Sequence, residues 1–259
     1  MDDEILYAVT DGVGMVTLNR PQARNALTFG MYERLATICS DLPGHGAPKV
    51  LVITGAGEKA FAAGTDISQF RAFATPEDAL GYEERIDRIL TAIETCPIPT
   101  IAAISGAVTG GGASIACACD MRIATANARF GFPVARTLGN CLSMSSYSRL
   151  VALLGAARVK DVVFTARLVE AEEGLRAGLY NEIVPDHAAL MQRAQELATT
   201  ISGHAPLTMR ATKEALHRLA HAGPLPAGDD LVVMCYMSAD FREGMEAFLG
   251  KRPPQWQGR

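Results

Sequence analysis

A regular alternation of short apolar runs with longer helical segments constrains the fold of this chain more than any other feature of its sequence. Residues 50–54 form an apolar run of strand length, and residues 100–104 form a second one after a helical segment at 82–95. Segments of both kinds continue downstream, with strands at 121–124, 128–131 and 180–184 and helices at 142–154 and 157–164. Alternation of this kind predicts an α/β fold.

The two ends of the chain differ from this alternation. Residues 5–10 and 15–18 are β-prone and flank Asp11-Gly12, a pair that favours a hairpin turn. From about residue 188 onward only helical segments are expected, at 188–202, 206–220 and 229–249. We therefore expect a core of residues 1–195 and a C-terminal helical region of residues 196–259.

The composition limits the classes of function. The chain has 259 residues, 49% of them hydrophobic, which is enough for one large core and a small appendage. Its net charge is only -4 with both signs interspersed, so nucleic acid is not an expected partner. No apolar run reaches the roughly 18 residues of a membrane span, and the acidic start is unlike a secretory signal. We expect a cytoplasmic protein with no membrane association, whose six cysteines are buried reduced thiols.

Two segments rich in small residues point to a site where backbone contacts a ligand. Residues 59–67, KAFAAGTDI, follow a buried strand. Residues 105–114, SGAVTGGGAS, place three consecutive glycines between a strand and a helix expected at 113–119. Glycines at a helix N-terminus let a ligand approach the unpaired N–H groups and the positive end of the helix dipole.

Taken together, the order and spacing of these segments resemble the enoyl-CoA hydratase/isomerase (crotonase) family. Four further stretches agree with the resemblance: NRPQARNAL at 19–27, ACDMRIA at 118–124, RFGFP at 129–133 and DFREGMEAFLGKR at 240–252. It covers nearly the whole chain. The fold that it implies is a crotonase-like (ClpP/crotonase) spiral of ββα units with a C-terminal helical region, assembled as a homotrimer or a dimer of trimers.

The resemblance also implies a site for an acyl-CoA thioester, with coenzyme A as part of the substrate and no metal or other cofactor. The backbone N–H groups of Thr65, where the family usually has Ala, and of Gly111 would form an oxyanion hole. Such a pair of donors stabilises the negative charge of an enolate oxygen. The positions that match substrate-binding positions of the family are Arg20, Ala23, Arg24, Asn25, Ala26, Ala63, Gly64, Asp66, Ile67, Gly110, Pro133, Leu138 and Lys251.

The chain departs from the family pattern at the acid and the base. Hydratases of the family carry glutamates where this chain has Ser114 and Val134, and neither side chain moves a proton as a carboxylate does. The ordinary two-glutamate hydration is therefore not expected. Arg136 and Cys141, in a stretch that lines the acyl end of the pocket in the family, are candidate substitutes, and a base from Glu83 or Glu84 is a further one.

Several readings stay open at this point. One is a decarboxylase or thioester hydrolase of the same family, in which Arg136 would hold a carboxylate of the substrate. Another is a non-catalytic acyl-CoA-binding protein. The stretch GAGEKA at 55–60 fits a dinucleotide-binding pattern, but no amphipathic helix follows it. His217 and His221 have helical metal-ligand spacing without a third ligand.

Overall fold

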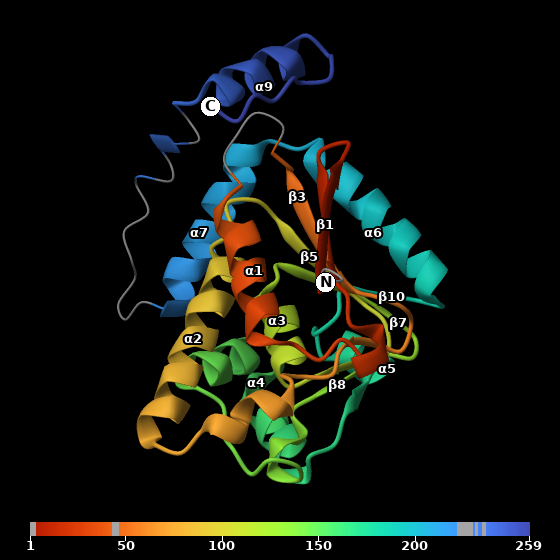
Figure 1. Cartoon of the computed structure of the whole chain (residues 1–259). Coiled ribbons are helices and arrows are strands. Elements are labelled where there is room, and N and C mark those ends of the chain that lie inside the picture. The colour runs from red at the N-terminus through yellow and green to blue at the C-terminus, as the bar shows by residue number, and fades with distance from the viewer. Residues whose placement is uncertain (1–3, 43–46, 222–229, 231–232, 235–236) are drawn as a thin grey trace.

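The computed structural model describes residues 4–42, 47–221, 230, 233–234 and 237–259 (Figure 1). The strands are β1 (Ile5–Thr10), β2 (Val13–Leu18), β3 (Val50–Gly55), β4 (Ala60–Ala62), β5 (Thr100–Ile104), β6 (Ala107–Thr109), β7 (Met121–Thr125), β8 (Arg129–Gly131), β9 (Val169–Glu170) and β10 (Glu182–Val184). The α-helices are α1 (Phe29–Ser40), α2 (Pro76–Glu94), α3 (Gly111–Ala118), α4 (Met144–Thr165), α5 (Ala171–Arg176), α6 (His187–Ser202), α7 (Pro206–His221) and α9 (Ala239–Leu249). Short 3-10 helices are η1 (Pro21–Ala23), η2 (Ile67–Ala72) and η3 (Pro133–Ala135).

The chain repeats a unit of two strands and a helix. In three successive units, β3-β4-α2, β5-β6-α3 and β7-β8-α4, the first strand joins a six-stranded sheet of order β1-β2-β3-β5-β7-β10. The second strand of each unit joins a four-stranded sheet of order β4-β6-β8-β9. Strands from β2 to β10 of the larger sheet pair in parallel, and β1 pairs with β2 as an antiparallel hairpin. The predicted α/β class and N-terminal hairpin are confirmed.

Both faces of the larger sheet are buried, which explains why its central strands are continuous apolar runs. Along β3, Leu51 and Ile53 pack on the side of α1, α2 and α3. Val50 and Val52 pack on the other side, against α6 (Figure 1). This alternation of period two puts a helical layer on each side of the sheet.

The structure differs from the expectations mainly at short and at broken elements. The strands β4, β6 and β9 have two or three residues each and carry too little pattern to be found in the sequence. A kink at Gly155, with φ 73° and ψ 150°, divides α4 and matches the two helices expected there. The prediction of a single helix at 229–249 is wrong where the structure describes this range, because a turn at Met237 and Ser238 precedes α9. Residues 229, 231–232 and 235–236 lie outside the described residues.

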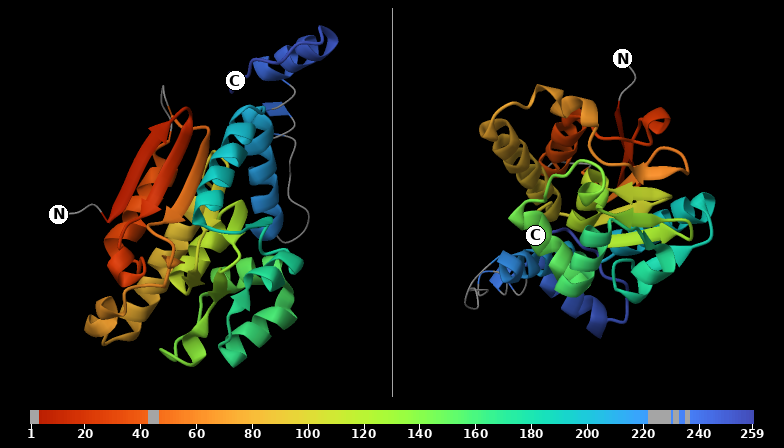
Figure 2. Two further views of the ribbon diagram at one scale, coloured as in Figure 1. Left: turned by 90° about the vertical axis from the view of Figure 1, so that its right-hand side faces the viewer. Right: turned by 90° about the horizontal axis from the view of Figure 1, so that it is seen from below.

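The expected boundary between residues 195 and 196 falls inside α6. The apolar side chains of this helix, Leu190, Ala194, Ala198 and Ile201, pack on the larger sheet on both sides of that boundary. The helix therefore belongs to the core to its end at Ser202, and the two-part division of the chain stays a prediction. Beyond it, α7 lies beside the core and α9 projects from the rest of the molecule (Figure 2). Among the described residues, no helix is long and apolar enough to cross a membrane.

Two glycine replacements test this packing in opposite directions. A Cβ on Gly55 would lie 2.4 Å from the carbonyl oxygens of Ala60 and Phe61 and 2.7 Å from Asn25 Nδ2, so we expect Gly55→Ala to lower the free energy of unfolding by about 1–3 kcal/mol. A Cβ on Gly81, within α2, meets nothing within 4 Å, so Gly81→Ala should raise that free energy by about 0.5–1 kcal/mol. Urea denaturation measures both, and equal effects of the two changes would contradict the packing.

Candidate active site

A cavity lies where β4, β6 and β8 end and the chain turns toward the following helices. Its volume is about 190 Å³, and its walls come from residues 63–70, 109–114 and 133–146 and from one face of α2. Parallel strands of an α/β fold commonly bring ligand-binding residues together at their carboxyl ends. Of the expected site residues, the cavity is lined by Ala63, Gly64, Thr65, Ile67, Gly110, Gly111, Ser114, Pro133, Val134, Leu138 and Cys141.

Two loop backbones approach each other in this cavity so closely that only glycine fits. A Cβ on Gly112 would lie 2.5 Å from the carbonyl oxygen of Ala62, and one on Gly111 would lie 1.8 Å from the Tyr32 hydroxyl oxygen. Gly110 has φ 52° and ψ -123°, a conformation open to glycine. The close approach explains why the sequence has three consecutive glycines here.

The N–H groups of Thr65 and Gly111 both lie outside the regular hydrogen-bond ladders. Leu27 forms a parallel bridge with Thr65 by donating to the carbonyl of Gly64 at 2.8 Å and accepting from the N–H of Asp66 at 2.9 Å. The N–H of Thr65 itself therefore faces away from Leu27. Gly111 is the first residue of α3, where an N–H has no acceptor within the helix. The cavity thus has two backbone donors on its lining residues.

The helix α3 is held at the end opposite the cavity by a buried arginine. The Nη1 of Arg122 donates to the carbonyl oxygens of Ala116 at 3.2 Å and Cys119 at 2.6 Å, and its Nε donates to Leu179 at 2.8 Å. A cation at the C-terminus complements the helix dipole and pairs carbonyls that the helix leaves open. The positive end of the dipole is left facing the cavity.

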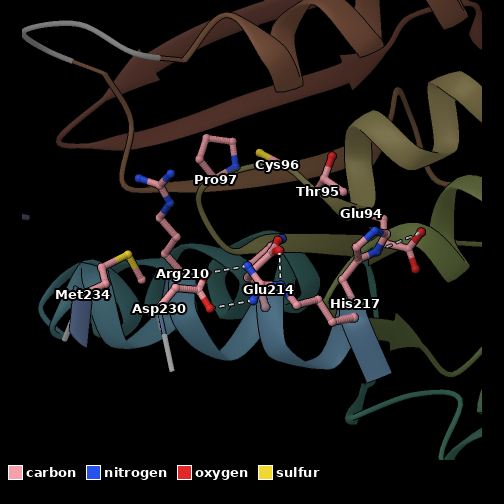
Figure 3. A pocket seen from close by; sticks show the side chains of 11 residues that line it. Glu94, Thr95, Cys96, Pro97, Arg210, Glu214, His217, Asp230 and Met234 are labelled. Atoms are coloured by element: carbon pink, nitrogen blue, oxygen red, sulfur yellow. Dashed lines mark hydrogen bonds and ion pairs between the residues drawn. The ribbon is translucent and has the colours of Figure 1, made fainter. Parts of the chain in front are cut away.

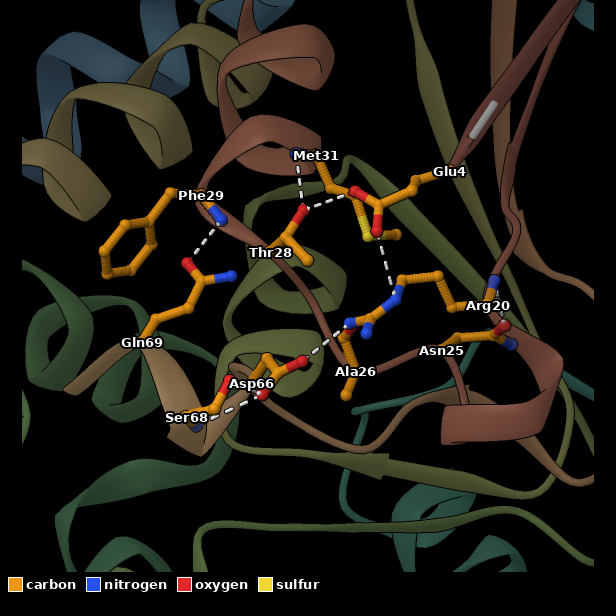
Figure 4. A network of polar contacts seen from close by, with 10 residues as sticks. All are labelled: Glu4, Arg20, Asn25, Ala26, Thr28, Phe29, Met31, Asp66, Ser68 and Gln69. Atoms are coloured by element: carbon orange, nitrogen blue, oxygen red, sulfur yellow. Dashed lines mark hydrogen bonds and ion pairs between the residues drawn. The ribbon is translucent and has the colours of Figure 1, made fainter. Parts of the chain in front are cut away.

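The loop that precedes α1 lies outside the cavity lining. Its first arginine, Arg20, is held by contacts within the protein. Arg20 Nη1 lies 3.0 Å from Asp66 Oδ2, and Arg20 Nε lies 3.2 Å from Glu4 Oε1 (Figure 4). Asp66 also caps η2, and hydrogen bonds from Ser68 and Arg20 hold its pKa below the ordinary value. Both Arg20 and Asp66 are therefore occupied by internal contacts.

Another part of the same loop is bonded to residues 60–63, which lead into the cavity wall. The buried Asn25 donates its amide to the carbonyl of Ala60 at 2.7 Å, and the N–H of Ala63 donates to the carbonyl of Arg24 at 3.0 Å. The Arg24 side chain is exposed, and no hydrogen bond or ion pair joins it to another described residue; Ala23 is half-buried beside it. Arg20, Ala23, Arg24, Asn25, Ala26 and Asp66 lie outside the cavity lining.

Ser114 and Val134 both line the cavity, where the resemblance implies glutamates. Each is 8% exposed. The Ser114 hydroxyl donates to the carbonyl of Gly110, at 3.3 Å, within its own helix. The Val134 side chain has no proton to exchange. The structure therefore brings the two positions together in one cavity without an acid or a base at either.

A carboxylate does reach the cavity from another element. Glu83 lines it from α2, and among the described lining residues no other carboxylate is present. Burial and the nearby Asp87 raise the pKa of Glu83, while the backbone N–H of Ser143 donates to its carboxylate. The Ser143 hydroxyl in turn donates to Asp87 at 2.7 Å. Glu84, its neighbour in sequence, is exposed and outside the lining.

Tyrosine and threonine hydroxyls form a chain at the same wall. Tyr32 Oη lies 2.9 Å from Thr65 Oγ1, which lies 2.9 Å from Tyr82 Oη. Tyr32 comes from α1 and is fully buried, whereas Tyr82 comes from α2 and lines the cavity. The Tyr82 ring packs edge-on against Phe70, with ring centroids 4.9 Å apart. Aromatic side chains thus close one side of the cavity.

Two expected site residues lie away from the cavity. Arg136 is exposed and absent from the lining, so nothing in the cavity favours its holding a substrate carboxylate. Lys251 is exposed just after α9, which projects from the core (Figure 2). A role for Lys251 in this cavity would have to come from another copy of the chain.

The cysteine prediction is confirmed for some of the thiols and wrong for another. Cys39, Cys96 and Cys119 are buried and free, and Cys117 is half-buried with its pKa raised by burial to about 12. Cys141 is exposed and lines the cavity, contrary to the expectation of buried thiols. Cys235 lies outside the described residues.

A second pocket lies between the end of α2 and α7 (Figure 3). None of the expected site residues lines it; Arg218 bonds to Glu214 and Asp230, Lys213 bonds to Asp120 outside the pocket, and His217 Nδ1 lies 3.9 Å from Glu94 Oε2. Within the described part of the chain, no three side chains of His, Cys, Asp or Glu are placed to hold a metal ion. This pocket is therefore not a candidate active site.

From the sequence, Glu83 was a candidate base only as one of two adjacent glutamates, and Tyr32 and Tyr82 were not candidate site residues. Glu83, Tyr82 and the buried Ile86 share the cavity face of α2, but their spacing also fits an ordinary amphipathic helix. Only the fold shows which turn of that helix meets the two loops. A tyrosine within the apolar face of α1 carries no signal of its own in the sequence.

Comparisons with known proteins agree on one family. A family model described as enoyl-CoA hydratase/isomerase matches residues 8–259. A short-chain enoyl-CoA hydratase of Clostridium acetobutylicum is 35% identical over 93% of this chain and 92% of its own, and a crotonyl-CoA hydratase of Syntrophomonas wolfei is 32% identical over 96% of each. The crystal structure of an enoyl-CoA hydratase/isomerase family protein from Hyphomonas neptunium superposes with a TM-score of 0.91 at 34% identity, covering 98% of both chains.

The contact between Gly111 and Tyr32 can be tested by a double-mutant cycle. We expect Gly111→Ala to lower the free energy of unfolding by about 1–3 kcal/mol, because the new Cβ overlaps the Tyr32 hydroxyl oxygen. In a Tyr32→Phe background the same change should cost less, because that oxygen is gone. Urea denaturation of the four proteins gives the coupling energy. Fully additive effects would contradict the contact.

Proposed function

Because the chain belongs to the enoyl-CoA hydratase/isomerase family, we propose that it converts an enoyl-CoA thioester through an enolate, with Glu83 moving the proton. The backbone N–H groups of Thr65 and Gly111 hold the thioester oxygen. The observation that carries the proposal is the position of Glu83, the one carboxylate among the described lining residues of the cavity that contains both donors.

The oxyanion assignment is supported by where charge would develop. Removing a proton next to a thioester carbonyl places negative charge on the carbonyl oxygen. Two fixed backbone donors in a small cavity stabilise that charge, each by about 3 kcal/mol of barrier in comparable sites. The N-terminus of α3 adds a favourable dipole at the same place.

One carboxylate is enough for a shift of a double bond along the acyl chain. The Glu83 carboxylate takes a proton from C2 of a 3-enoyl-CoA, giving a dienolate whose oxygen accepts from Thr65 and Gly111. The protonated Glu83 then returns the proton to C4, so the double bond ends between C2 and C3 and no atom is gained or lost. The raised pKa of Glu83 favours both halves of this exchange, because the group must accept and then release one proton.

Hydration of a 2-enoyl-CoA is the second candidate. It is favoured by relatives that are named hydratases, among them the proteins of C. acetobutylicum and S. wolfei. In this reaction Glu83 alone would have to take a proton from water and deliver one to C2. The absence of a carboxylate at Ser114 and Val134 makes the isomerisation the better supported of the two.

The remaining readings receive less support from the site. A decarboxylase or thioester hydrolase with an acidic acyl group would require Arg136 at the cavity, and this side chain is exposed elsewhere. A non-catalytic acyl-CoA binder would bind the thioester without turnover and is an outcome of the test below. The proposed chemistry uses no metal or redox cofactor, and we propose a cytoplasmic location.

The nucleotide part of coenzyme A is proposed to contact the loop at 19–27. Arg24 is the arginine of this loop whose exposed side chain makes no hydrogen bond or ion pair with a described residue, whereas Arg20 is held by Glu4 and Asp66. Its backbone is bonded to Ala63 beside the oxyanion segment. A phosphate bound by Arg24 would therefore lie beside the segment that leads to Thr65.

The assignment of Glu83 predicts a specific loss of activity. Glu83→Gln should lower kcat for 3-enoyl-CoA isomerisation by about 100- to 10,000-fold, because the amide cannot carry the proton. In the unmodified protein kcat should fall with decreasing pH as Glu83 becomes protonated. Since its pKa is raised, the fall should begin at a higher pH than for an ordinary glutamate near 4.5. Steady-state assays with 3-hexenoyl-CoA across pH measure both effects.

Glu84→Gln is the matched control, because it makes the same change one residue away on an exposed side chain. It should leave kcat within about twofold. A parallel assay with crotonyl-CoA, read as a gain of one water in the product mass, separates hydration from isomerisation. If Glu83→Gln keeps the activity of the unmodified protein, then Glu83 is not the base. Binding without turnover of either thioester would support the non-catalytic reading instead.

We further propose a homotrimer or a dimer of trimers. Leu216 and Leu219 on α7 are 61% and 52% exposed, and Phe241 on α9 is 44% exposed, so the C-terminal helices present apolar side chains to solvent in a single chain. Contact with another copy would bury them. Sedimentation velocity should give three or six times the chain mass of 27.5 kDa. A monomer at every concentration would contradict the assembly.

A further inference from the structure

The hydroxyl chain of Tyr32, Thr65 and Tyr82 has one proton more than its internal contacts use. The two contacts of 2.9 Å join three hydroxyls, and each hydroxyl carries one hydrogen. Two of these hydrogens are donated in the two hydrogen bonds. The third is left to point elsewhere, and its position follows from what surrounds each end of the chain.

The burial of Tyr32 decides which way its hydroxyl hydrogen points. The side chain of Tyr32 is fully buried, so a spare hydrogen on Tyr32 would be a buried donor without an acceptor, which is unfavourable. Tyr32 therefore donates to Thr65. When Thr65 in turn donates to Tyr82, the spare hydrogen lies on Tyr82, which lines the cavity. Hydroxyls that donate in sequence also polarise one another and strengthen the terminal donor.

The terminal hydroxyl lies next to the oxyanion donors. Tyr82 bonds to the side chain of Thr65, a lining residue whose backbone N–H is not used in the bridge to Leu27. Thr65 Oγ1 would be 3.0 Å from a Cβ placed on Gly111, so the three groups meet at one point of the wall. The Tyr82 hydroxyl thus lies on the side of the cavity that carries Thr65 and Gly111.

We propose that Tyr82 is a catalytic residue whose hydroxyl donates a third hydrogen bond to the thioester oxygen, and that the side chains of Tyr32 and Thr65 position it. The inference rests on the proposed function for the identity of the ligand. It goes beyond that function because two backbone donors suffice for an oxyanion hole. Burial raises the pKa of Tyr82 to about 12, so the hydroxyl stays protonated and neutral near pH 7.

The test reads the bound ligand directly and needs no turnover. Acetoacetyl-CoA loses its C2 proton to solvent when its oxygen is stabilised, and the resulting enolate absorbs in the near ultraviolet where the ketone does not. With saturating ligand, Tyr82→Phe should lower the enolate-to-ketone ratio at least about tenfold, the scale of one lost oxyanion donor being about 100-fold or more. The Kd of butyryl-CoA, which forms no stable enolate, should change less than about threefold.

Variants of the positioning residues Thr65 and Tyr32 should lower the enolate ratio by a smaller amount. Thr65→Val keeps the backbone N–H and the shape of the side chain but removes the central hydroxyl, and Tyr32→Phe removes the first one. Both should lower the enolate ratio less than Tyr82→Phe, because the Tyr82 hydroxyl remains but loses its orientation. Tyr147→Phe, on α4 and outside the cavity lining, is the control that should leave the ratio unchanged. Melting temperatures verify that each variant is folded.

The outcomes separate this inference from the proposed function. An unchanged enolate ratio in folded Tyr82→Phe would overturn the role of Tyr82 while leaving the role of Glu83 intact. Should that variant not fold, the ratio in Thr65→Val and Tyr32→Phe decides, and no change in either would overturn the inference. If the unmodified protein does not bind acetoacetyl-CoA, the proposed function fails and the inference fails with it. A lowered enolate ratio in Tyr82→Phe together with full activity of Glu83→Gln would support the role of Tyr82 and refute only the role of Glu83 as the base.

Discussion

The structure depends on the close approach of two backbones, the segment after β4 and the start of α3. With a Cβ on Gly112 only 2.5 Å from the carbonyl oxygen of Ala62, any side chain there would push the start of α3 away from the end of β4. This contact fixes where the N–H groups of Thr65 and Gly111 lie relative to each other. It also sets the direction of α3, since the helix begins at the contact and ends against the buried Arg122. The position of the cavity follows from a packing constraint before any chemistry is considered.

Charge in the cavity is distributed differently from what the resemblance implies. The two positions for glutamates, Ser114 and Val134, are uncharged, and the carboxylate arrives from α2 instead. Glu83 is supported there by the N–H of Ser143, at the start of α4, and is near Asp87. A base on a helix that packs by its apolar face is placed by burial of residues such as Ile86 and Ile89. In the proposed mechanism, the groups that stabilise the enolate and the group that moves the proton therefore come from different elements of the fold.

How much the sequence predicts depends on the length of each pattern. The continuous apolar run of β3 and the Thr28 cap of α1 were predictable, because buried parallel strands and helix caps have local signatures. The strands β4, β6 and β9 were not, because two or three residues show no period; β8 and β10 are as short, but the β-prone runs at 128–131 and 180–184 extend beyond them. The two segments that line the cavity at 63–67 and 109–114 were recognised from their small residues and glycines. Tyr32 was missed because its hydroxyl gains meaning only from Thr65, a residue 33 positions away.

The side chain at position 65 connects the backbone chemistry with the hydroxyl chain. An alanine, usual at this position in the family that the sequence resembles, would supply the same N–H but leave the buried Tyr32 hydroxyl without its partner. An unpaired buried hydroxyl costs about 1–3 kcal/mol, so Tyr32 and Thr65 are favourable only as a pair. Thr65 Oγ1 also lies 2.9 Å from the Tyr82 hydroxyl, so the pair extends to a third hydroxyl on α2. The three residues are best understood as one unit, in which satisfying a buried donor orients a hydroxyl that faces the cavity.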